Sequence, residues 1–431
     1  MKKIVIGLCL VLLGVFFIGC DGGTSDRVII DFWHMSPVGS ESFSATKQII
    51  NEFNESQELY TVKGTGFGFW DYWDKIAVAI SSKTAPDIGF STIDDVPIRA
   101  EAGVLYNISD LIDADPDGID IEELYQSQLD FATYEGDLYA LPFTATTRVL
   151  YYNLDMFAEV GLTEADVPTT WEELHTVAKQ LDVDEDGVIQ QLGFDPTYGN
   201  ATYHGYLWQC GLDFFDDDLN PTLNTQKHID VLQWMIDFNS EYTRNQLVAF
   251  GDANAMLGIN VFAGERVAMI VEVDGLYQII QNAGATFNYG VTSIPLPDED
   301  GVRVNWGSGF SVELYDNRKN EEDQKAGAWE FLKYLMSKEV QKEFSTANGW
   351  LMAHQEAMEE VAEGNTIMTR LLEEVAYARD KRYVAYAPSW HGNDWQPYYN
   401  QALNRELTAE QALAAARANY LQKKENWEAT H

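Results

Sequence analysis

The feature that most constrains this chain is the regular exchange of strand-like and helix-like segments near its start. Residues 28–33 form an apolar run typical of a buried strand, and further strands are predicted at 60–62 and 87–90. Between them, apolar residues recur at helical spacing from residue 44 and again over 72–82. Strands that alternate with helices favour a layered α/β fold with a mainly parallel sheet.

The later part of the chain continues this pattern. Extended segments are predicted at 147–152, 267–271 and 289–294, and long helices at 323–336 and 395–424. Periodic apolar residues mark each helix, since a helix that packs on a core buries every third or fourth side chain. With 431 residues, the chain is long enough for two or more hydrophobic cores.

Two helix starts carry a clear local signal. Thr170 is followed three residues later by Glu173, and Thr408 by Gln411. In such a capping box, each side chain hydrogen-bonds to the backbone N–H of the other residue. We therefore predict that helices begin at these two threonines.

The first twenty residues resemble an export signal. Lys2 and Lys3 precede an apolar run over 4–18, which ends at Gly19-Cys20. A Gly-Cys end resembles the bacterial lipobox, in which the cysteine is acylated, so we predict a signal peptide at 1–19, a lipid on Cys20 and a tether over 20–26. An uncleaved anchor or an ordinary secretory signal is the alternative, but the run is short of the roughly 20 residues that cross a bilayer.

The remaining cysteines exclude a disulfide framework. Cys9 would leave with the signal and Cys20 would carry lipid, which leaves Cys210 without an intramolecular partner. We expect Cys210 to pack as a small hydrophobic residue rather than to act as a nucleophile.

The chain is strongly acidic. Its formal charge of −40 becomes −42 when the two signal lysines are removed. Such a charge excludes nucleic-acid binding and disfavours anionic lipid surfaces and phosphorylated ligands. A solvated acidic surface explains it better than a specific cationic partner.

Short segments in a characteristic order cover the whole mature chain. They lie at residues 30–34, 83–88, 141–143, 149–157, 161–162, 168–174, 264–269, 289–297 and 328–335. In their order and spacing they resemble the extracellular solute-binding proteins that serve bacterial ATP-driven sugar importers, a family that includes maltose-binding protein as a distant relative.

The resemblance implies a type II periplasmic-binding-protein-like fold, in which two α/β lobes joined by crossover strands close around a ligand cleft. Crossings are expected near 141–148, 289–295 and 348–351. The resemblance implies an N-terminal lobe of residues 27–143 plus 290–348 and a C-terminal lobe of residues 144–289 plus 349–431.

A sugar-binding cleft needs aromatic faces for the sugar ring and carboxylates or amides for its hydroxyls. The chain contains 12 Trp and 22 Tyr, more than two lobe cores usually need. In the first lobe, His34, Asp94 and Asp95 follow strands, near the sheet edge where ligands meet α/β folds. Trp70 precedes a helix and could form one wall of the cleft. The alternatives are that the aspartates cap a helix and that Trp70 covers the sheet.

The crossover and the second lobe supply further candidates. Thr146 and Arg148 are expected to face the cleft, although Arg148 could instead pair with a buried carboxylate. The resemblance assigns ligand contacts to four aromatic residues and to a stacking tryptophan, namely Tyr203, Tyr206, Trp208, Tyr277 and Trp395.

The turn Trp306-Gly307-Ser308-Gly309 resembles a glycine-rich turn of sugar-binding members. Trp306 is expected to stack on the sugar, and the glycines to allow close backbone approach to the ligand.

One acidic motif imitates a calcium loop. Asp182, Asp184 and Asp186 have the spacing of its first ligands, but Gly193 stands where the bidentate glutamate belongs. We interpret the motif as an acidic turn with calcium binding left open, and we predict no metal and no cofactor.

The sequence thus predicts a monomeric, non-enzymatic substrate-binding lipoprotein of an ABC importer, held outside the cytoplasm by a lipid anchor. It would capture a carbohydrate and deliver it to a membrane permease. The alternatives are a binder of peptides or polyamines on the same scaffold and, with 68 acidic residues available for a catalytic pair, a secreted glycosidase or lyase.

Overall fold

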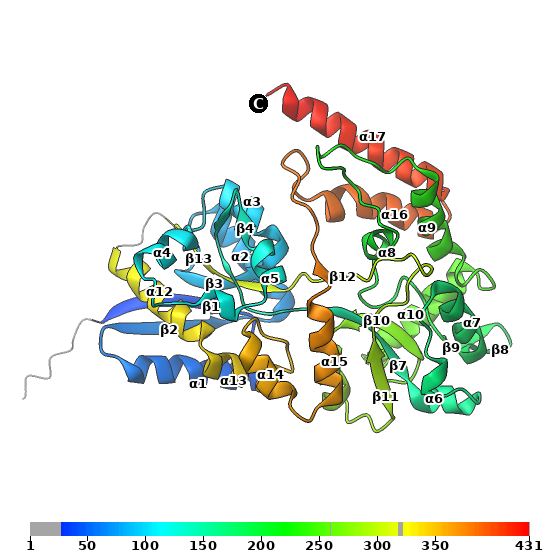
Figure 1. The fold of residues 1–431 in the computed structure, drawn as a ribbon, viewed down its shortest axis with the longest axis horizontal. Helices are drawn as coiled ribbons and strands as arrows, with labels where there is room; N and C mark the ends of the chain where they lie inside the picture. Colours follow the sequence, from blue (N-terminus) through cyan, green and yellow to red (C-terminus); the bar gives the residue numbers. More distant parts are fainter. Residues whose placement is uncertain (1–26, 259, 318–321, 431) are drawn as a thin grey trace, which may run out of the picture.

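The computed structural model of this chain describes residues 27–258, 260–317 and 322–430. The predicted signal peptide, Cys20 and the whole of the predicted tether therefore lie outside the described residues. Within the described ranges, no helix combines the length and the apolar character that crossing a bilayer requires. The chain forms two lobes that lie side by side, joined by several segments (Figure 1).

The N-terminal lobe is built on a five-stranded sheet in the order β2-β1-β3-β13-β6. Its strands are β1 (Val28–His34), β2 (Tyr60–Gly66), β3 (Ile88–Thr92), β6 (Leu141–Pro142) and β13 (Phe310–Leu314). The three predicted strands are confirmed, and β1 pairs in parallel with β2 and β3. The sheet is mixed rather than wholly parallel, because β13 returns from the other lobe and runs antiparallel to β3 and β6.

Helices and short turns enclose this sheet. The helices are α1 (Glu41–Ser56), α2 (Phe69–Ser81), α3 (Val96–Glu101), α4 (Ile108–Ala114), α5 (Gln126–Phe131), α12 (Glu322–Met336), α13 (Lys338–Asn348) and α14 (Gln355–Ala362). The minor elements are the hairpin β4 (Thr133–Tyr134) and β5 (Asp137–Leu138), and the 3₁₀ turns η1 (Ile93–Asp95) and η2 (Ile121–Glu123).

The C-terminal lobe has a small sheet in the order β10-β7-β11. Its strands are β7 (Arg148–Asn153), β10 (Met269–Val273) and β11 (Tyr289–Thr292), and β7 runs antiparallel to both neighbours. A hairpin of β8 (Val183–Glu185) and β9 (Val188–Gln191) lies at its outer end.

Helices make up most of this lobe. They are α6 (Leu154–Glu159), α7 (Trp171–Leu181), α8 (Tyr203–Gln209), α9 (Gln226–Asp237), α10 (Arg244–Leu257), α11 (Leu276–Asn282), α15 (Thr366–Val375), α16 (Gln396–Leu403) and α17 (Ala409–Glu428), with the 3₁₀ turn η3 (Glu164–Asp166) and the π-helical turn η4 (Trp390–Trp395). Both predicted capping boxes are confirmed, at Thr170 with Glu173 and at Thr408 with Gln411.

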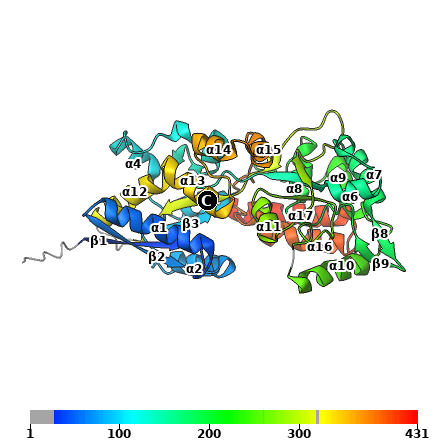
Figure 2. The ribbon, with the colours of Figure 1, turned by 90° about the horizontal axis from the view of Figure 1, so that it is seen from below.

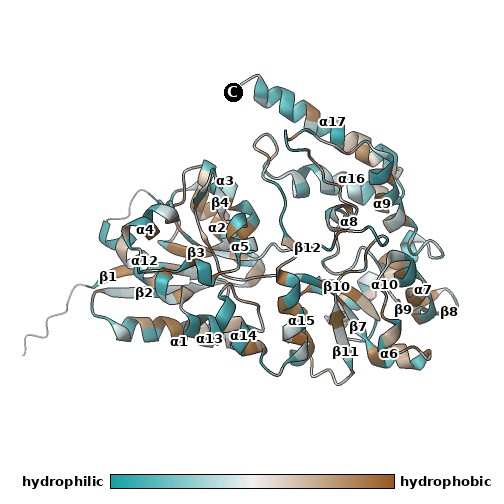
Figure 3. Ribbon diagram, in the orientation of Figure 1, coloured by the Kyte–Doolittle hydropathy of each residue, from teal (hydrophilic) through white to brown (hydrophobic). Residues whose placement is uncertain are grey.

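Each lobe has its own hydrophobic core. One large cluster joins the first sheet to α1, α12 and α13, while three clusters fill the second lobe. Figure 3 shows the strands β3 and β7 largely hydrophobic, whereas α17 carries hydrophilic residues along much of its length. Separate cores allow each lobe to move as a unit about the connecting segments.

Three segments cross between the lobes side by side. The first crossing follows β6, and there the backbone N–H of Ala145 donates at 2.9 Å to the carbonyl of Leu351, which lies between α13 and α14. The second crossing joins α14 to α15, rather than lying near residues 348–351. The remaining crossing enters the N-terminal lobe at Phe310, whose carbonyl accepts from the N–H of Phe143 and of Thr144. A short two-stranded sheet of β12 (Asn305–Trp306) and β14 (Ala378–Arg379) lies beside these crossings.

The lobe boundaries differ from the sequence-based ones at two places. The segment from 290 to about 304 belongs to the C-terminal lobe, because β11 pairs with β7 and the N–H of Val302 donates to the carbonyl of Gln209. The helix α14 belongs to the N-terminal lobe, because Ala357 and Met358 are part of its core. An apolar strand or helix looks the same in sequence whichever lobe it packs against, which explains both differences.

Candidate functional site

The glycine-rich turn lies beside the crossings. Trp306 is on β12, and its indole Nε1 donates a hydrogen bond to Oδ1 of Asp380 at 3.1 Å. A Cβ added to Gly307 would lie 2.5 Å from Cβ of Ala378, and one added to Gly309 would lie 2.5 Å from Oγ1 of Thr144. The glycines are therefore required by the close approach of neighbouring segments of the chain itself.

Arg148, at the start of β7, holds this turn in place. Its side chain is buried, and Nη1 donates to the carbonyl oxygens of Trp306 at 2.6 Å and of Ser308 at 3.1 Å. Its guanidinium carbon lies 4.0 Å from the centre of the Trp306 ring, a cation–π contact. Burial lowers the pKa of Arg148 to about 10, which still leaves the side chain charged at neutral pH.

An ion pair connects the two lobes next to Trp306. Asp94, in the loop after β3, accepts from the ammonium of Lys381 at 2.6 Å, and their side chains are only 10% and 17% exposed. The same ammonium lies 4.8 Å from the centre of the Trp306 ring. Asp95 instead accepts from Oγ1 of Thr92 within its own lobe, so of the two predicted aspartates only Asp94 makes a contact across the lobes.

The titration of these groups is strongly perturbed. Burial acts to raise the pKa of Asp94, but the Lys381 ammonium and the Ser308 hydroxyl outweigh it and hold the pKa below its ordinary value. Burial, reinforced by the Asp94 carboxylate, raises the pKa of Asp380 to about 7. Burial also lowers the pKa of His391 to about 3, so this neighbour of Trp306 is neutral. Perturbed groups of this kind gather at functional sites more often than elsewhere.

A pocket opens beside this ion pair, between the lobes. Asp94 and Asp95 line one side of it, and residues 381–383 and 388–393 of the other lobe line the rest. It encloses about 750 Å³ of space, part of it open to solvent. Small-molecule sites typically occupy about 300–1,000 Å³.

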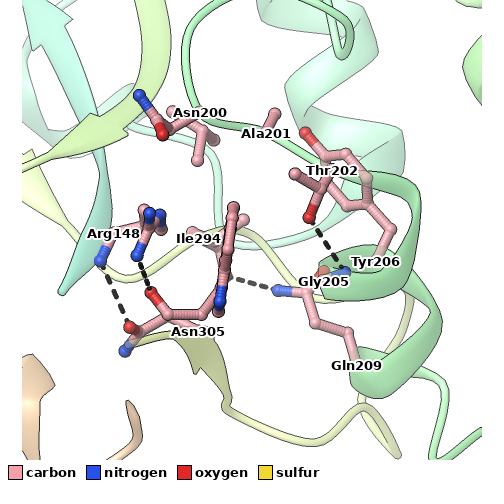
Figure 4. Close-up of a pocket in the computed structure, with 11 residues that line it drawn as sticks. Arg148, Asn200, Ala201, Thr202, Gly205, Tyr206, Gln209, Ile294 and Asn305 are labelled. Carbon is pink, nitrogen blue, oxygen red and sulfur yellow. Dashed lines mark hydrogen bonds between the residues drawn. The ribbon is translucent and has the colours of Figure 1, made fainter. Parts of the chain in front are cut away.

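A second, smaller pocket of about 270 Å³ lies on the C-terminal-lobe side of Trp306. Figure 4 shows its polar lining, to which β7, β12 and α8 contribute Arg148, Asn305 and Gln209, together with Asn200 and Thr202 from the loop before α8. The Nε atom of Arg148 is buried and has no hydrogen-bond partner among the residues that the structure describes. Such a lining offers both donors and acceptors to a hydroxylated ligand.

Four of the predicted ligand-facing aromatic residues are buried in the C-terminal lobe, namely Tyr203, Tyr206, Trp208 and Trp395. Tyr203, Tyr206 and Trp395 belong to its hydrophobic core, whereas the Trp208 ring lies 4.6 Å from the guanidinium carbon of Arg379. Trp395 is 1% exposed, and its ring packs against Tyr203, Phe214 and Tyr399. Tyr206 alone of the four borders the smaller pocket. These rings have no face open for stacking in this structure, because the short helix α8 is enclosed by α9 and the π-helical turn η4.

The other predicted site residues are scattered. His34 is buried in the first lobe, where it packs against Phe32 and Phe43. The hydroxyl of Tyr277 accepts from the side-chain amide of Asn365. Thr146 lies in the crossover, with its Oγ1 3.3 Å from that of Thr144. Trp70 is strongly exposed at the start of α2, where its ring packs edge-on against Phe69.

No metal centre is evident in the described ranges, where His, Cys, Asp and Glu side chains nowhere gather in threes suited to an ion. In the acidic motif, Asp182 accepts from the N–H of Gly193 and from Lys179, while Asp184 accepts from the N–H of Gly187. These bonds are those of an acidic turn.

Sequence reasoning missed Asp380, Lys381 and His391. Asp380 and Lys381 lie in the loop after β14, and His391 lies in the π-helical turn η4. These segments carry no periodic pattern and no motif, and only the fold brings them against Asp94. The one local signal is the run Asp380-Lys381-Arg382, whose charged residues are unremarkable in so acidic a chain.

Comparison with known proteins supports the reading of the fold. Residues 48–365 match the family model described as bacterial extracellular solute-binding protein. A protein of Brucella abortus (strain 2308) named as a binding protein is 25% identical over 270 residues, which are 59% of this chain and 60% of that one. The chain thus spans about three fifths of the length of that relative.

Two further similarities extend over more of the chain. The sn-glycerol-3-phosphate-binding periplasmic protein of Agrobacterium fabrum (strain C58) is 20% identical over 346 residues, covering 77% of this chain and 75% of that protein. The solved structure of CpMnBP1 with mannotriose bound superposes with a TM-score of 0.78 at 19% identity, covering 91% of this chain and all of that one. The family match covers well over half of the sequence and agrees with the two-lobed fold, so this chain belongs to the bacterial extracellular solute-binding proteins.

Proposed function

We propose that this protein captures a carbohydrate between its lobes and delivers it to the permease of an ABC importer. The observation that carries the proposal is the meeting of Trp306 with charged residues from both lobes at the crossings. Asp94 comes from the N-terminal lobe and Lys381 from the C-terminal lobe. Both residues border the pocket between the lobes, and the Lys381 ammonium also lies over the Trp306 ring. An aromatic face flanked by carboxylate and ammonium groups suits a ring of hydroxyls.

In the proposed complex, the sugar takes the position over Trp306 that the Lys381 ammonium now holds. Asp94 and Lys381 then each bind hydroxyl groups instead of one another. Arg148, Thr146 and the turn at Gly307 and Ser308 support the site, since Arg148 holds the turn through its two carbonyl contacts. Because the site draws on both lobes, a ligand there favours the closed arrangement.

The charges favour a neutral ligand over a phosphate ester, although some relatives bear the name of a glycerol-phosphate binder. Lys381 is already paired with Asp94, and Arg148 with two carbonyls. The pKa of Asp380 at about 7 shows how unfavourable a further negative charge is at this place. A phosphate dianion would have to be desolvated beside both aspartates.

The same charges leave a cationic solute, such as a polyamine or a basic peptide, as the second candidate. Its ammonium group would replace that of Lys381 between Asp94 and the Trp306 ring. The hydroxyl- and amide-rich lining of the smaller pocket suits a sugar better, because cations there would lie beside Arg148.

Location and delivery belong to the same proposal. An export signal that ends at Cys20 would anchor the mature chain to the outer side of a bacterial membrane. There, the closed protein would present both lobes to a permease, and the sugar would leave unchanged.

The test is a thermal-shift screen of the purified protein with neutral mono- and oligosaccharides, glycerol 3-phosphate and spermidine, followed by titration calorimetry of the hits. A ligand at 100 times its Kd stabilises the folded state by about 2.7 kcal/mol, which such a screen detects. Asp94→Asn should weaken sugar binding about tenfold or more, while Asp130→Asn, on the exposed part of α5, should leave it unchanged. Binding of glycerol 3-phosphate or spermidine in preference to every sugar, or conversion of the sugar to products, would refute the proposal.

A further inference from the structure

A row of five aromatic side chains crosses the N-terminal lobe from the start of α2 to the lobe junction. Its members are Trp70, Phe69, Trp73, Phe310 and Trp350. Successive ring centroids lie 5.1 Å apart from Trp70 to Phe69 and 5.6 Å from Phe69 to Trp73. They continue at 5.8 Å from Trp73 to Phe310 and 5.5 Å from Phe310 to Trp350.

The row runs outward from the core of the N-terminal lobe, against which Trp73, Phe310 and Trp350 pack. Trp70 is 80% exposed and Phe69 38% exposed, while the other three rings are half-buried. Most of the chain's large aromatic residues are buried, as Trp395 and Trp208 illustrate. A connected set of rings that remains accessible to solvent marks a binding surface more often than a packing defect.

The row is continuous with the proposed sugar site. Phe310 directly follows the turn that begins at Trp306, and its backbone N–H donates to Oγ1 of Thr144 in the first crossing at 2.8 Å. At the far end, Trp350 reaches the C-terminal lobe, since a Cβ on Gly275 would lie 4.0 Å from its Cδ1. Figure 2 shows α2 and α11, the helix that follows Gly275, in the lower half of the molecule, each in its own lobe.

The polar surroundings of the row indicate what covers it. Asp71 and Asp74 project from the exposed side of α2, next to Trp70 and Trp73. Carboxylates among rings suit a ligand with apolar ring faces and hydroxyl edges, whereas an anionic lipid surface would be repelled.

We infer that the ligand is an oligosaccharide, and that the row from Trp350 to Trp70 binds the sugar units beyond the one held at Trp306. This inference rests on the proposed function. A monosaccharide would occupy the site at Trp306 alone and leave the row uncovered. A longer chain would lie along α2, with each added unit stacking on a further ring.

The experiment measures affinity against chain length. Titration calorimetry of the whole purified protein would use manno- and malto-oligosaccharides of one to five units, preceded by a thermal-shift screen of other neutral sugar series if neither binds. Affinity should rise with length by on the order of tenfold over the series. Trp70→Ala should remove most of the gain from the longer members while leaving the affinity of the shortest binding member unchanged.

Two further variants complete the experiment, one in the row and one outside it. Trp70 is so exposed that its replacement should not affect folding, and Phe69→Ala provides a second substitution in the row. Trp427→Ala, which removes an exposed tryptophan in the last turn of α17, should change no affinity. Binding that is independent of length, or equal in Trp70→Ala and the parent, would overturn the inference and leave the proposed function standing.

Two further outcomes distinguish a failure of the inference from a failure of the proposed function. If no neutral sugar binds at any length, the proposed function fails and the inference with it. If Trp70→Ala binds every oligosaccharide normally but loses transport in permease-containing vesicles, the row is a permease contact and the inference is wrong.

Discussion

Replacing Lys381 with methionine should destabilise the folded protein more than removing any exposed lysine. Lys381 and Asp94 form an ion pair across the lobes at 2.6 Å, with side chains 17% and 10% exposed. Methionine keeps most of the side-chain length but leaves the Asp94 carboxylate without its counter-ion. Breaking a fully buried pair in this way costs about 3–5 kcal/mol. Because water still reaches part of this pair, we expect a cost of about 2–3 kcal/mol at pH 7.5.

The substitution of the other member of the pair, Asp94→Asn, should destabilise the folded protein less than Lys381→Met. In Asp94→Asn the ammonium remains, but Asp380 also lies close enough to raise the pKa of Lys381 and stays as a counter-ion. The double variant Asp94→Asn/Lys381→Met removes both members of the pair, so only the Asp380 carboxylate remains without the Lys381 ammonium, and it should recover part of the loss. The coupling energy from the double-mutant cycle should be at least about 1 kcal/mol.

The assay is equilibrium unfolding in urea of the ligand-free protein, followed by both tryptophan fluorescence and circular dichroism. Two probes are needed because two lobes need not unfold together. The exposed pair of Arg370 and Glu373 on α15 provides the control, since Arg370→Met should change the midpoint little.

The pH dependence supplies a further check on the same reasoning. The folded-state pKa of Asp94 is lowered, so its contribution to stability is present above about pH 4 and is lost as the pH falls through the folded value. The cost of Lys381→Met should therefore shrink in acid, where Asp94 is protonated. A cost below about 0.5 kcal/mol at pH 7.5, or single-variant costs that simply add, would refute the view that this pair joins the lobes.

Three other predictions concern stability. The pKa of Asp380 is raised to about 7, so the contribution of this carboxyl group to folding stability should decrease as the pH rises from about 4 to 7. In thermal melts, Asp380→Asn should therefore be more stable than the parent at pH 8 but not at pH 4. Gly309→Ala should cost about 1–3 kcal/mol in urea unfolding, because its Cβ would lie within 2.6 Å of the hydroxyl oxygens of two crossover threonines, whereas Gly392→Ala, with open space around it, should be neutral. Trp395→Ala should destabilise the C-terminal lobe by about 3–5 kcal/mol, and a normal melting temperature with weakened sugar binding would show instead that the ring faces the ligand.

The burial of Trp395 illustrates why the site was harder to predict than the fold. Trp395 and Trp306 are both tryptophans in segments that resemble the same family. One is enclosed by Tyr203, Phe214 and Tyr399, while the other lies between Arg148 and Lys381. Their sequence context contains no information about which helix will cover which ring.

Elements specified by nearby residues were predictable from the sequence. The strands at β1, β2 and β3, the helix α12 and both capping boxes occur where periodicity and end signals place them. These signals act over a few residues along the chain, so they can be recognised in the sequence without knowing which other segments the element packs against. The apolar run over residues 4–18 and the acidic character are likewise properties of the sequence alone.

The tertiary structure alone decided which segments meet. It assigned β11 to the second lobe through its pairing with β7, brought Lys381 against Asp94 across 287 positions of chain numbering, and placed Trp306 beside both. Contacts between distant segments depend on how whole sheets and helices pack, and that packing is a property of both lobes together. The sequence therefore determined the local elements and the family, and the folded chain determined the site.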